Sequence, residues 1–218
     1  MGDGYLDELY VRISEIAKQD IYSFMKSNNQ SSLNYQFTSY FQHYVDTHNI
    51  KLLGHHFSNR KIEGLTIIDK EGISFSYERE NSKEKQNFTK CHELGHFILG
   101  HSGKFFTELR GIQDRLVERE ANIFSSIILM PDIVLLSKIF YRKDDFQRVI
   151  EDLSVSREAL IFRLVGMFLH FLFEEEVEIF KVVDEYCQGC NQKILDYFQQ
   201  VKKYIINDYQ KVKRNIFE

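Results

Sequence analysis

Proline is almost absent from this sequence. Among 218 residues there is a single proline, Pro131. Because proline breaks helix interiors, its scarcity permits long helices and favours a mainly helical protein. Cysteine is also scarce, and only Cys187 and Cys190 have the spacing of a metal-binding or redox pair. One such pair excludes a structural zinc site with four cysteines, and three cysteines in all fit a reducing compartment. We interpret Cys187 and Cys190 as incidental thiols at a helix junction, and a redox pair is the alternative.

A strong net charge and a long apolar run are also missing. The formal net charge is −4, which excludes the dominant basic surface that marks many nucleic-acid-binding proteins. No apolar run is long enough to cross a bilayer, and the first residues, MGDGYLDELYVR, lack the basic start and apolar middle of a signal peptide. We therefore expect a cytoplasmic protein that makes no membrane contact and does not bind nucleic acid directly.

The most informative stretch is Asn87 to Gly100, with the sequence NFTKCHELGHFILG. On a helix, His92 and His96 lie one turn apart on the same face, so both can reach one metal ion. Glu93 follows His92 directly and is placed beside the metal. This spacing is typical of zinc peptidases, in which two imidazoles hold Zn²⁺ and the neighbouring carboxylate is the general base. The alternative is a buried helix whose histidines are hydrogen-bonded to carbonyl groups.

A third metal ligand is expected, because catalytic zinc usually has three protein ligands and a fourth position for water. Residues 114–130, DRLVEREANIFSSIILM, read as a second helix that stops before Pro131 and offers Glu118 and Glu120. Glu118 lies on a face whose side chains are small enough to let another helix approach closely. That face also carries Ala121, Asn122 and Ser125. Glu120 lies among larger apolar residues, so we choose Glu118 as the third ligand and Glu120 as the runner-up.

With these two helices in view, the sequence resembles the ImmA/IrrE-type metallopeptidases. The segment NFTKCHELGHFILGH resembles the family's F-T-x-A-HELGH-x-x-L, and EREANIFSSIILMP resembles its E-x-x-A-N-x-F-A-x-x-L-L-M-P. Further on, LSVSREALIFRLVGM resembles V-S-x-x-A-x-x-x-R-L. The resemblance covers residues 50–170, departs mildly at Cys91, Ser125 and Ile128, and implies that Glu118 is the metal-binding glutamate. It also implies a zinc peptidase that cleaves helix-turn-helix repressors and is associated with mobile elements and stress responses.

Three short segments before the metal helix read as strands: residues 50–57, 62–69 and 72–77. The last two are joined by a turn at Lys70-Glu71-Gly72 and are typical of a β-hairpin. We predict that the strand directly before the metal helix is a sheet edge, to which a substrate peptide adds as another strand. The candidate substrate-binding residues are Ile73, Ser74, Phe75, Ser76 and Tyr77. An ordinary edge strand covered by a loop is the alternative.

The predicted fold is α+β: a mostly helical, zincin-like metallopeptidase domain with a small antiparallel sheet, followed by C-terminal helices. Residues 1–172 form the domain, including N-terminal helices and a helix-turn-helix-like segment at 144–172, and residues 173–218 form a helical extension. The segment 144–172 has few basic residues, so we interpret it as a structural or partner-docking unit rather than a DNA reader. The C-terminal helix either packs back on the domain or pairs with a second copy in a homodimer. His101, which follows the metal helix, is expected to cap it.

The sequence therefore predicts a zinc-dependent endopeptidase, with His92, His96 and Glu118 as ligands and Glu93 as general base. By resemblance, its protein partner is a helix-turn-helix repressor, whose cleavage switches on a mobile element or stress genes. The alternative is a non-proteolytic binding protein that sequesters a repressor or antitoxin and in which zinc is structural.

Overall fold

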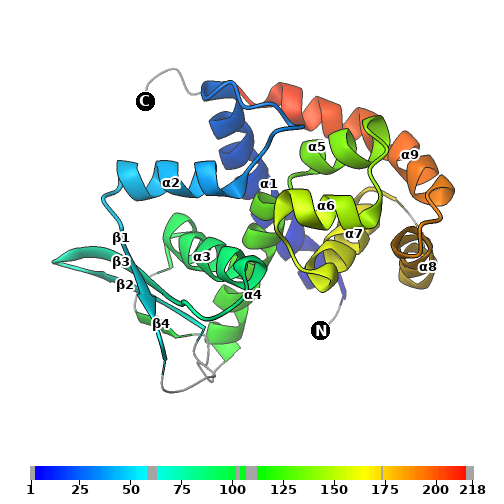
Figure 1. The fold of residues 1–218 in the computed structure, drawn as a ribbon. Coiled ribbons are helices and arrows are strands. Elements are labelled where there is room, and N and C mark those ends of the chain that lie inside the picture. Colours follow the sequence, from blue (N-terminus) through cyan, green and yellow to red (C-terminus); the bar gives the residue numbers. More distant parts are fainter. Residues whose placement is uncertain (1–2, 58–62, 102–103, 107–111, 173, 215–218) are drawn as a thin grey trace. The chain divides into compact units, whose positions relative to one another are not determined.

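The structure is a computed structural model that describes residues 3–57, 63–101, 104–106, 112–172 and 174–214 (Figure 1). The chain forms two compact units. One comprises residues 36–125 and contains the described strands, and the other comprises residues 1–35 and 126–218. The α+β class is confirmed. The boundary expected at residue 172 does not coincide with these limits, and the division into a domain and an extension stays a prediction.

The unit of residues 36–125 is built on a four-stranded sheet. Its strands are β1 (Lys51–His55), β2 (Gly64–Asp69), β3 (Gly72–Glu78) and β4 (Lys104–Phe106), in the spatial order β1-β3-β2-β4. Strands β2 and β3 form the predicted antiparallel hairpin. Gly72 at its turn has a φ of 126°, a conformation that glycine adopts without steric cost. Strand β1 pairs with β3 in parallel, so the sheet is mixed and not wholly antiparallel.

Strand β3 is an interior strand, and the prediction of a substrate-binding edge was wrong. It pairs with β1 on one side and with β2 on the other, and the edges of the sheet are β1 and β4. The backbone groups of an interior strand are already paired, so a peptide cannot add to them as another strand. The residues concerned are Ile73, Ser74, Phe75, Ser76 and Tyr77. The error arose because β1 reaches β3 through a long-range parallel pairing, which leaves no local pattern in the sequence.

Three helices complete this unit: α2 (Phe37–Thr47), α3 (Lys83–Ile98) and α4 (Ile112–Leu129), which continues into the other unit. Helix α3 lies against the sheet (Figure 1). Phe75 of β3 is buried, and its ring lies 6.5 Å from the ring of Phe41 on α2 and 6.5 Å from that of Phe97 on α3. Helix α3 begins after Ser82, whose hydroxyl accepts a hydrogen bond from the backbone amide of Lys85. This packing fixes α3, the predicted metal helix, on the sheet.

The other unit is helical in its described part. Its elements are α1 (Asp3–Ser27), the end of α4, α5 (Asp132–Leu135), the π-helical turn η1 (Leu136–Tyr141), α6 (Phe146–Leu153), α7 (Arg157–Phe171), α8 (Glu176–Cys187) and α9 (Gln192–Lys211). Helices α6 and α7 are the two helices of the segment 144–172. Cys187 and Cys190 lie at the junction of α8 and α9 and are free thiols; the choice between incidental thiols and a redox pair stays a prediction.

A buried ion cluster joins three helices of this unit. Asp132 on α5 binds the guanidinium of Arg163 on α7, and its other carboxylate oxygen lies 2.8 Å from Nζ of Lys18 on α1. Burial opposes ionisation of Asp132, but the two cations outweigh it and lower its pKa to about 2. Arg163 also donates to the backbone oxygen of Met130 at 3.1 Å. The cluster therefore ties the start of α5, next to the single proline, to α1 and α7.

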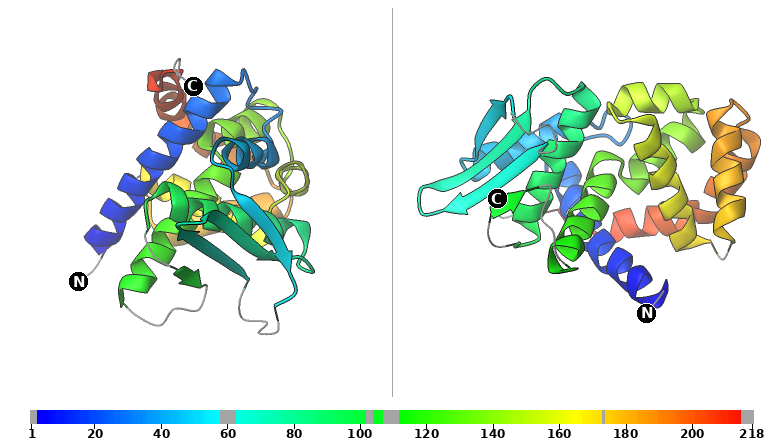
Figure 2. Two further views of the ribbon diagram at one scale, coloured as in Figure 1. Left: turned by 90° about the vertical axis from the view of Figure 1, so that its left-hand side faces the viewer. Right: turned by 90° about the horizontal axis from the view of Figure 1, so that it is seen from below.

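Helix α9 packs back within its own unit, as one of the two alternatives predicted. Its apolar stripe is buried and consists of Ile194, Phe198, Val201 and Ile205. The C-terminal ends of α1 and α9 lie side by side (Figure 2). There the ring of Tyr22 lies 5.1 Å from the ring of Tyr209, and the hydroxyl of Ser23 donates to the backbone oxygen of Lys213. The apolar stripe of α9 is therefore covered by other residues of the same chain.

One helical stretch corrects the expectation that no segment is apolar enough to cross a membrane. Leu116–Tyr141 passes that test by length and composition, and it is the one stretch among the described residues that does so. However, 78% of its most apolar window is buried inside the protein. A core helix of a soluble protein has these properties, because an apolar helix must be covered on all sides.

Candidate metal centre

Three side chains of the unit 36–125 converge on one point. His92 and His96 lie one turn apart on α3, and their Nε2 atoms are 3.0 Å from each other. Glu118 on α4 faces both: Oε2 lies 3.0 Å from Nε2 of His92, and Oε1 lies 3.3 Å from Nε2 of His96. The structure thus brings together the two histidines of the motif and the glutamate chosen as third ligand, as a group that could hold a metal ion.

The spacing of these atoms fits a tetrahedral zinc ion. Zinc bonds of about 2.0–2.1 Å at tetrahedral angles place neighbouring ligand atoms about 3.3 Å apart. The observed separations among the three side chains are 3.0, 3.0 and 3.3 Å. Two imidazoles and one carboxylate are also the ligand types of catalytic zinc sites with an open fourth position. The residues present therefore fit the metal.

Small residues explain how α3 and α4 come close enough to form this cluster. A side chain at Gly95 would place its Cβ 3.2 Å from the ring of Phe124 and 3.5 Å from the backbone of Ala121. Cys91 and Ser125 lie on the same contact, with the Cys91 sulfur 3.9 Å from the backbone oxygen of Ser125. Both are fully buried. Close approach of the two backbones at Gly95 lets Glu118 reach the histidines.

The charges within the cluster favour a cation. Burial would raise the pKa of Glu118, but its hydrogen bonds with His92 and His96 lower that pKa to about 2. Burial would lower the pKa of His92, but its hydrogen bond with Glu118 and the charges of Glu93 and Glu118 raise the pKa overall. Burial lowers the pKa of His96. Glu118 is therefore ionised at neutral pH and His96 is neutral, as metal ligands must be, whereas His92 holds its proton more tightly and would lose it when a metal binds.

Glu93 is held beside the cluster by strand β2. Its side chain is buried and accepts a hydrogen bond from the hydroxyl of Thr66. Gly64, at the start of the same strand, leaves the space that the carboxylate occupies, because a Cβ there would lie 2.3 Å from Oε1 of Glu93. Burial raises the pKa of Glu93 to about 7, against the opposing effects of His92 and of the Thr66 hydrogen bond. A carboxylate with this pKa is suited to exchange protons at neutral pH.

Further side chains contact the outer nitrogens of both histidines. Nδ1 of His92 lies 3.0 Å from Oδ1 of Asn122. Nδ1 of His96 lies 2.8 Å from Nδ1 of His101, whose Nε2 lies 2.8 Å from Oε2 of Glu120. Glu120, the runner-up ligand, therefore contacts His101, and His101 in turn contacts the ligand His96.

Sequence reasoning missed the position of His101. Its backbone amide does bond to the last turn of α3, donating to the backbone oxygen of His96 at 3.0 Å. Its ring, however, turns back to the ring of His96. The signal that could have shown this is Gly100, which has a φ of 71° and reverses the chain directly after the helix.

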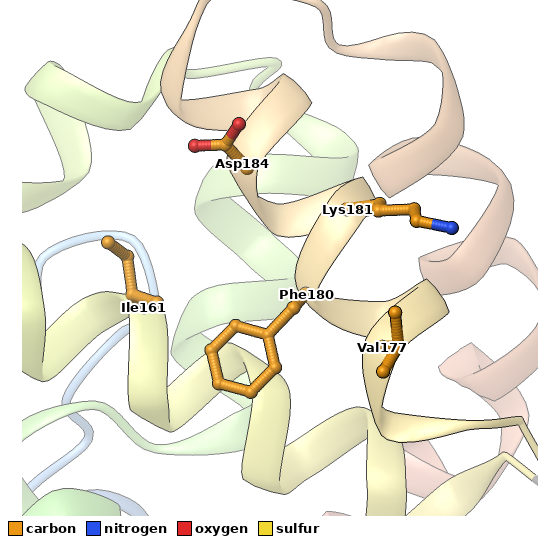
Figure 3. A pocket seen from close by; sticks show the side chains of 5 residues that line it. All are labelled: Ile161, Val177, Phe180, Lys181 and Asp184. Carbon is orange, nitrogen blue, oxygen red and sulfur yellow. The ribbon is translucent and has the colours of Figure 1, made fainter.

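The described residues contain two other features that share no residue with this cluster. His56 lies 3.6 Å from Glu78 and 3.5 Å from Glu80, but His56 and Glu80 are largely exposed. In the other unit, a pocket of about 490 Å³ lies between α7 and α8 (Figure 3). It is mainly apolar, and its lining residues are Ile161, Val177, Phe180, Lys181 and Asp184. Neither feature brings a general base together with buried metal ligands.

The fold and the site together define an α+β protein with a candidate metal centre held between two helices. A protein-family model described as the IrrE N-terminal-like domain matches residues 45–165, which is more than half of the chain. The chain belongs to this peptidase family, which confirms the resemblance stated above and supports a metallopeptidase role. A search of curated proteins found no match.

Proposed function

We propose that this protein is a zinc-dependent endopeptidase, in which His92, His96 and Glu118 bind the metal and Glu93 is the general base. The observation that carries the proposal is the convergence of three ligand atoms at 3.0–3.3 Å beside a buried carboxylate. Membership of a peptidase family supports the same reaction class.

Different residues have different roles in the proposed hydrolysis of a peptide bond. Bound zinc would supply a Lewis acid that polarises the substrate carbonyl and lowers the pKa of water. Glu93 accepts the proton of the attacking water and later delivers it to the leaving amine. The Thr66 hydroxyl holds the Glu93 carboxylate in place between these two transfers. Burial raises the pKa of Glu93 in the metal-free protein, and this burial favours uptake of the proton by the carboxylate.

The resemblance to ImmA/IrrE-type peptidases points to the substrate. It supports a helix-turn-helix repressor in the cytoplasm, whose cleavage derepresses a mobile element or stress genes. A homodimer through the C-terminal helix stays a prediction. The apolar stripe of α9 is buried in its own unit, so a dimer would have to use other residues of that helix.

The test is to exchange the proposed base while keeping the ligands. Glu93→Gln removes the proton acceptor at nearly unchanged size, so we expect full zinc binding and no cleavage of the helix-turn-helix repressor encoded nearby. Fragments produced at the wild-type rate by Glu93→Gln would refute the role of Glu93. A wild-type protein that forms a stable complex with the repressor and never yields fragments would instead favour the binding-protein alternative.

A further inference from the structure

A hydrogen-bonded chain of three side chains ends at the proposed metal ligand His96. It starts at Glu120 on α4, passes through His101 and reaches Nδ1 of His96, with both contacts at 2.8 Å. The three side chains are buried: the side chain of Glu120 is 10% exposed, that of His101 7% and that of His96 1%. Nothing in the proposed reaction uses Glu120 or His101 directly.

The direction of every hydrogen bond in this chain follows from the donor and acceptor chemistry. A carboxylate oxygen can only accept, so Nε2 of His101 carries a proton and donates it to Glu120. In neutral His101 the other ring nitrogen, Nδ1, then has a lone pair and can only accept. Nδ1 of His96 must therefore be the donor of the contact between the two rings. With its proton on Nδ1, His96 presents the lone pair of Nε2.

That lone pair points at the cluster of ligand atoms. Nε2 of His96 is the atom that lies 3.0 Å from His92 and 3.3 Å from Glu118. On His92, Nδ1 faces the amide oxygen of Asn122 at 3.0 Å and is likewise a donor. Without a metal, the Glu118 carboxylate faces Nε2 of both rings and favours a proton there. A bound cation replaces that proton, so the outer contacts of both histidines match the metal-bound state, in which Nε2 is the ligand atom.

We infer that His101 and Glu120 form a positioning pair that holds the ring of His96 in place and accepts its Nδ1 proton when Nε2 binds a metal ion. This inference rests on the metal site of the proposed function and extends it to two residues outside the ligand set. Outer partners of ligand histidines typically change metal affinity by about 10–100-fold when removed. His101 and Glu120 are positioning residues, because neither reaches the metal or the substrate.

The first experiment follows the Nδ1 proton of His96 in the zinc-loaded, full-length protein labelled with ¹⁵N-histidine. Proton spectra at neutral pH show how fast that proton exchanges with water. We expect slow exchange in wild type, where His101 accepts the proton, and much faster exchange in His101→Leu. Equally fast exchange in both proteins would overturn the inference.

The second experiment measures zinc affinity by competition with a chromophoric chelator. We expect zinc binding by His101→Leu to be weaker than that of wild type by about 10–100-fold. His101→Gln is the matched control, because its amide oxygen can accept from His96 while its amide nitrogen donates to Glu120. It should restore most of the lost affinity. Equal affinities for wild type and His101→Leu would overturn the inference.

A third variant keeps the test usable if His101→Leu does not fold. Glu120→Gln preserves the size of the side chain but offers both a donor and an acceptor to His101, so the direction of the chain is no longer fixed. We expect faster exchange of the His96 Nδ1 proton and weaker zinc binding in this variant than in wild type, and wild-type values for both would contradict the role of Glu120. A wild-type protein that binds no zinc would end the proposed function, whereas unaffected variants of a zinc-binding wild type would end only this inference.

Discussion

Gly64→Ala should displace the proposed general base without touching the metal ligands. The added Cβ would lie 2.3 Å from Oε1 of Glu93 and 2.6 Å from Cγ2 of Thr89, and real Cβ contacts essentially never fall under 3.0 Å. The Glu93 carboxylate must therefore move by roughly 0.7 Å, and misplacement of a catalytic group by about 1 Å can cost about 100-fold in rate. We expect a comparable fall in kcat for repressor cleavage.

The assay compares single-turnover cleavage and zinc content for wild type, Gly64→Ala and a matched control. Gly54→Ala is that control, because its Cβ would have no contact under 3.0 Å: the nearest atoms belong to Tyr77, whose hydroxyl lies at 3.2 Å, and to Arg79, whose Cβ lies at 3.5 Å. We expect full zinc content in both variants, slow cleavage in Gly64→Ala and normal cleavage in Gly54→Ala. Wild-type cleavage rates in Gly64→Ala would refute the claim that Gly64 makes room for Glu93.

Two further predictions concern the packing of the helices. Gly95→Val should weaken zinc binding and lower stability by about 1–3 kcal/mol, because the new side chain overlaps the ring of Phe124 and separates α3 from α4. Gly166→Ala, whose Cβ has its nearest contact at 3.7 Å, should leave zinc affinity unchanged. Asp132→Asn should cost about 3–5 kcal/mol in urea unfolding, because it leaves the buried Arg163 without a carboxylate partner and Lys18 with Asp208 at 3.5 Å as its remaining ion pair. Glu178→Gln, in an exposed pair, should show no resolvable change. The pKa of Asp132 is about 2 in the folded protein and about 3.9 in the unfolded chain. The stability that ionised Asp132 contributes is therefore complete above about pH 5 and is lost as the pH falls from about 5 to about 2.

The site could be predicted from sequence because its determinants are local. The spacing of His92 and His96 fixes one face of one helix. The choice of Glu118 over Glu120 followed from the small side chains on its face, and the structure shows the close approach at Gly95 that this argument required.

The parts that sequence reasoning missed depend on contacts between distant segments. Strand β3 looked like an edge because the hairpin is local, whereas its parallel partner β1 is not. The chain from Glu120 to His101 needs the reversal at Gly100 and the approach of α4 at the same time. Ile73–Tyr77 and His101 were therefore misplaced for the same reason: their partners lie on other elements.

Zinc content per chain, measured by elemental analysis after equilibration with a slight excess of zinc, tests the central claim most directly. The variants are His92→Ala, Glu118→Ala and Glu120→Ala, beside wild type. We predict about one zinc ion in wild type, none in His92→Ala or Glu118→Ala, and a retained but more weakly held ion in Glu120→Ala. Full zinc content in Glu118→Ala with loss in Glu120→Ala would contradict the site described above, and a wild type without zinc would contradict the proposed function itself.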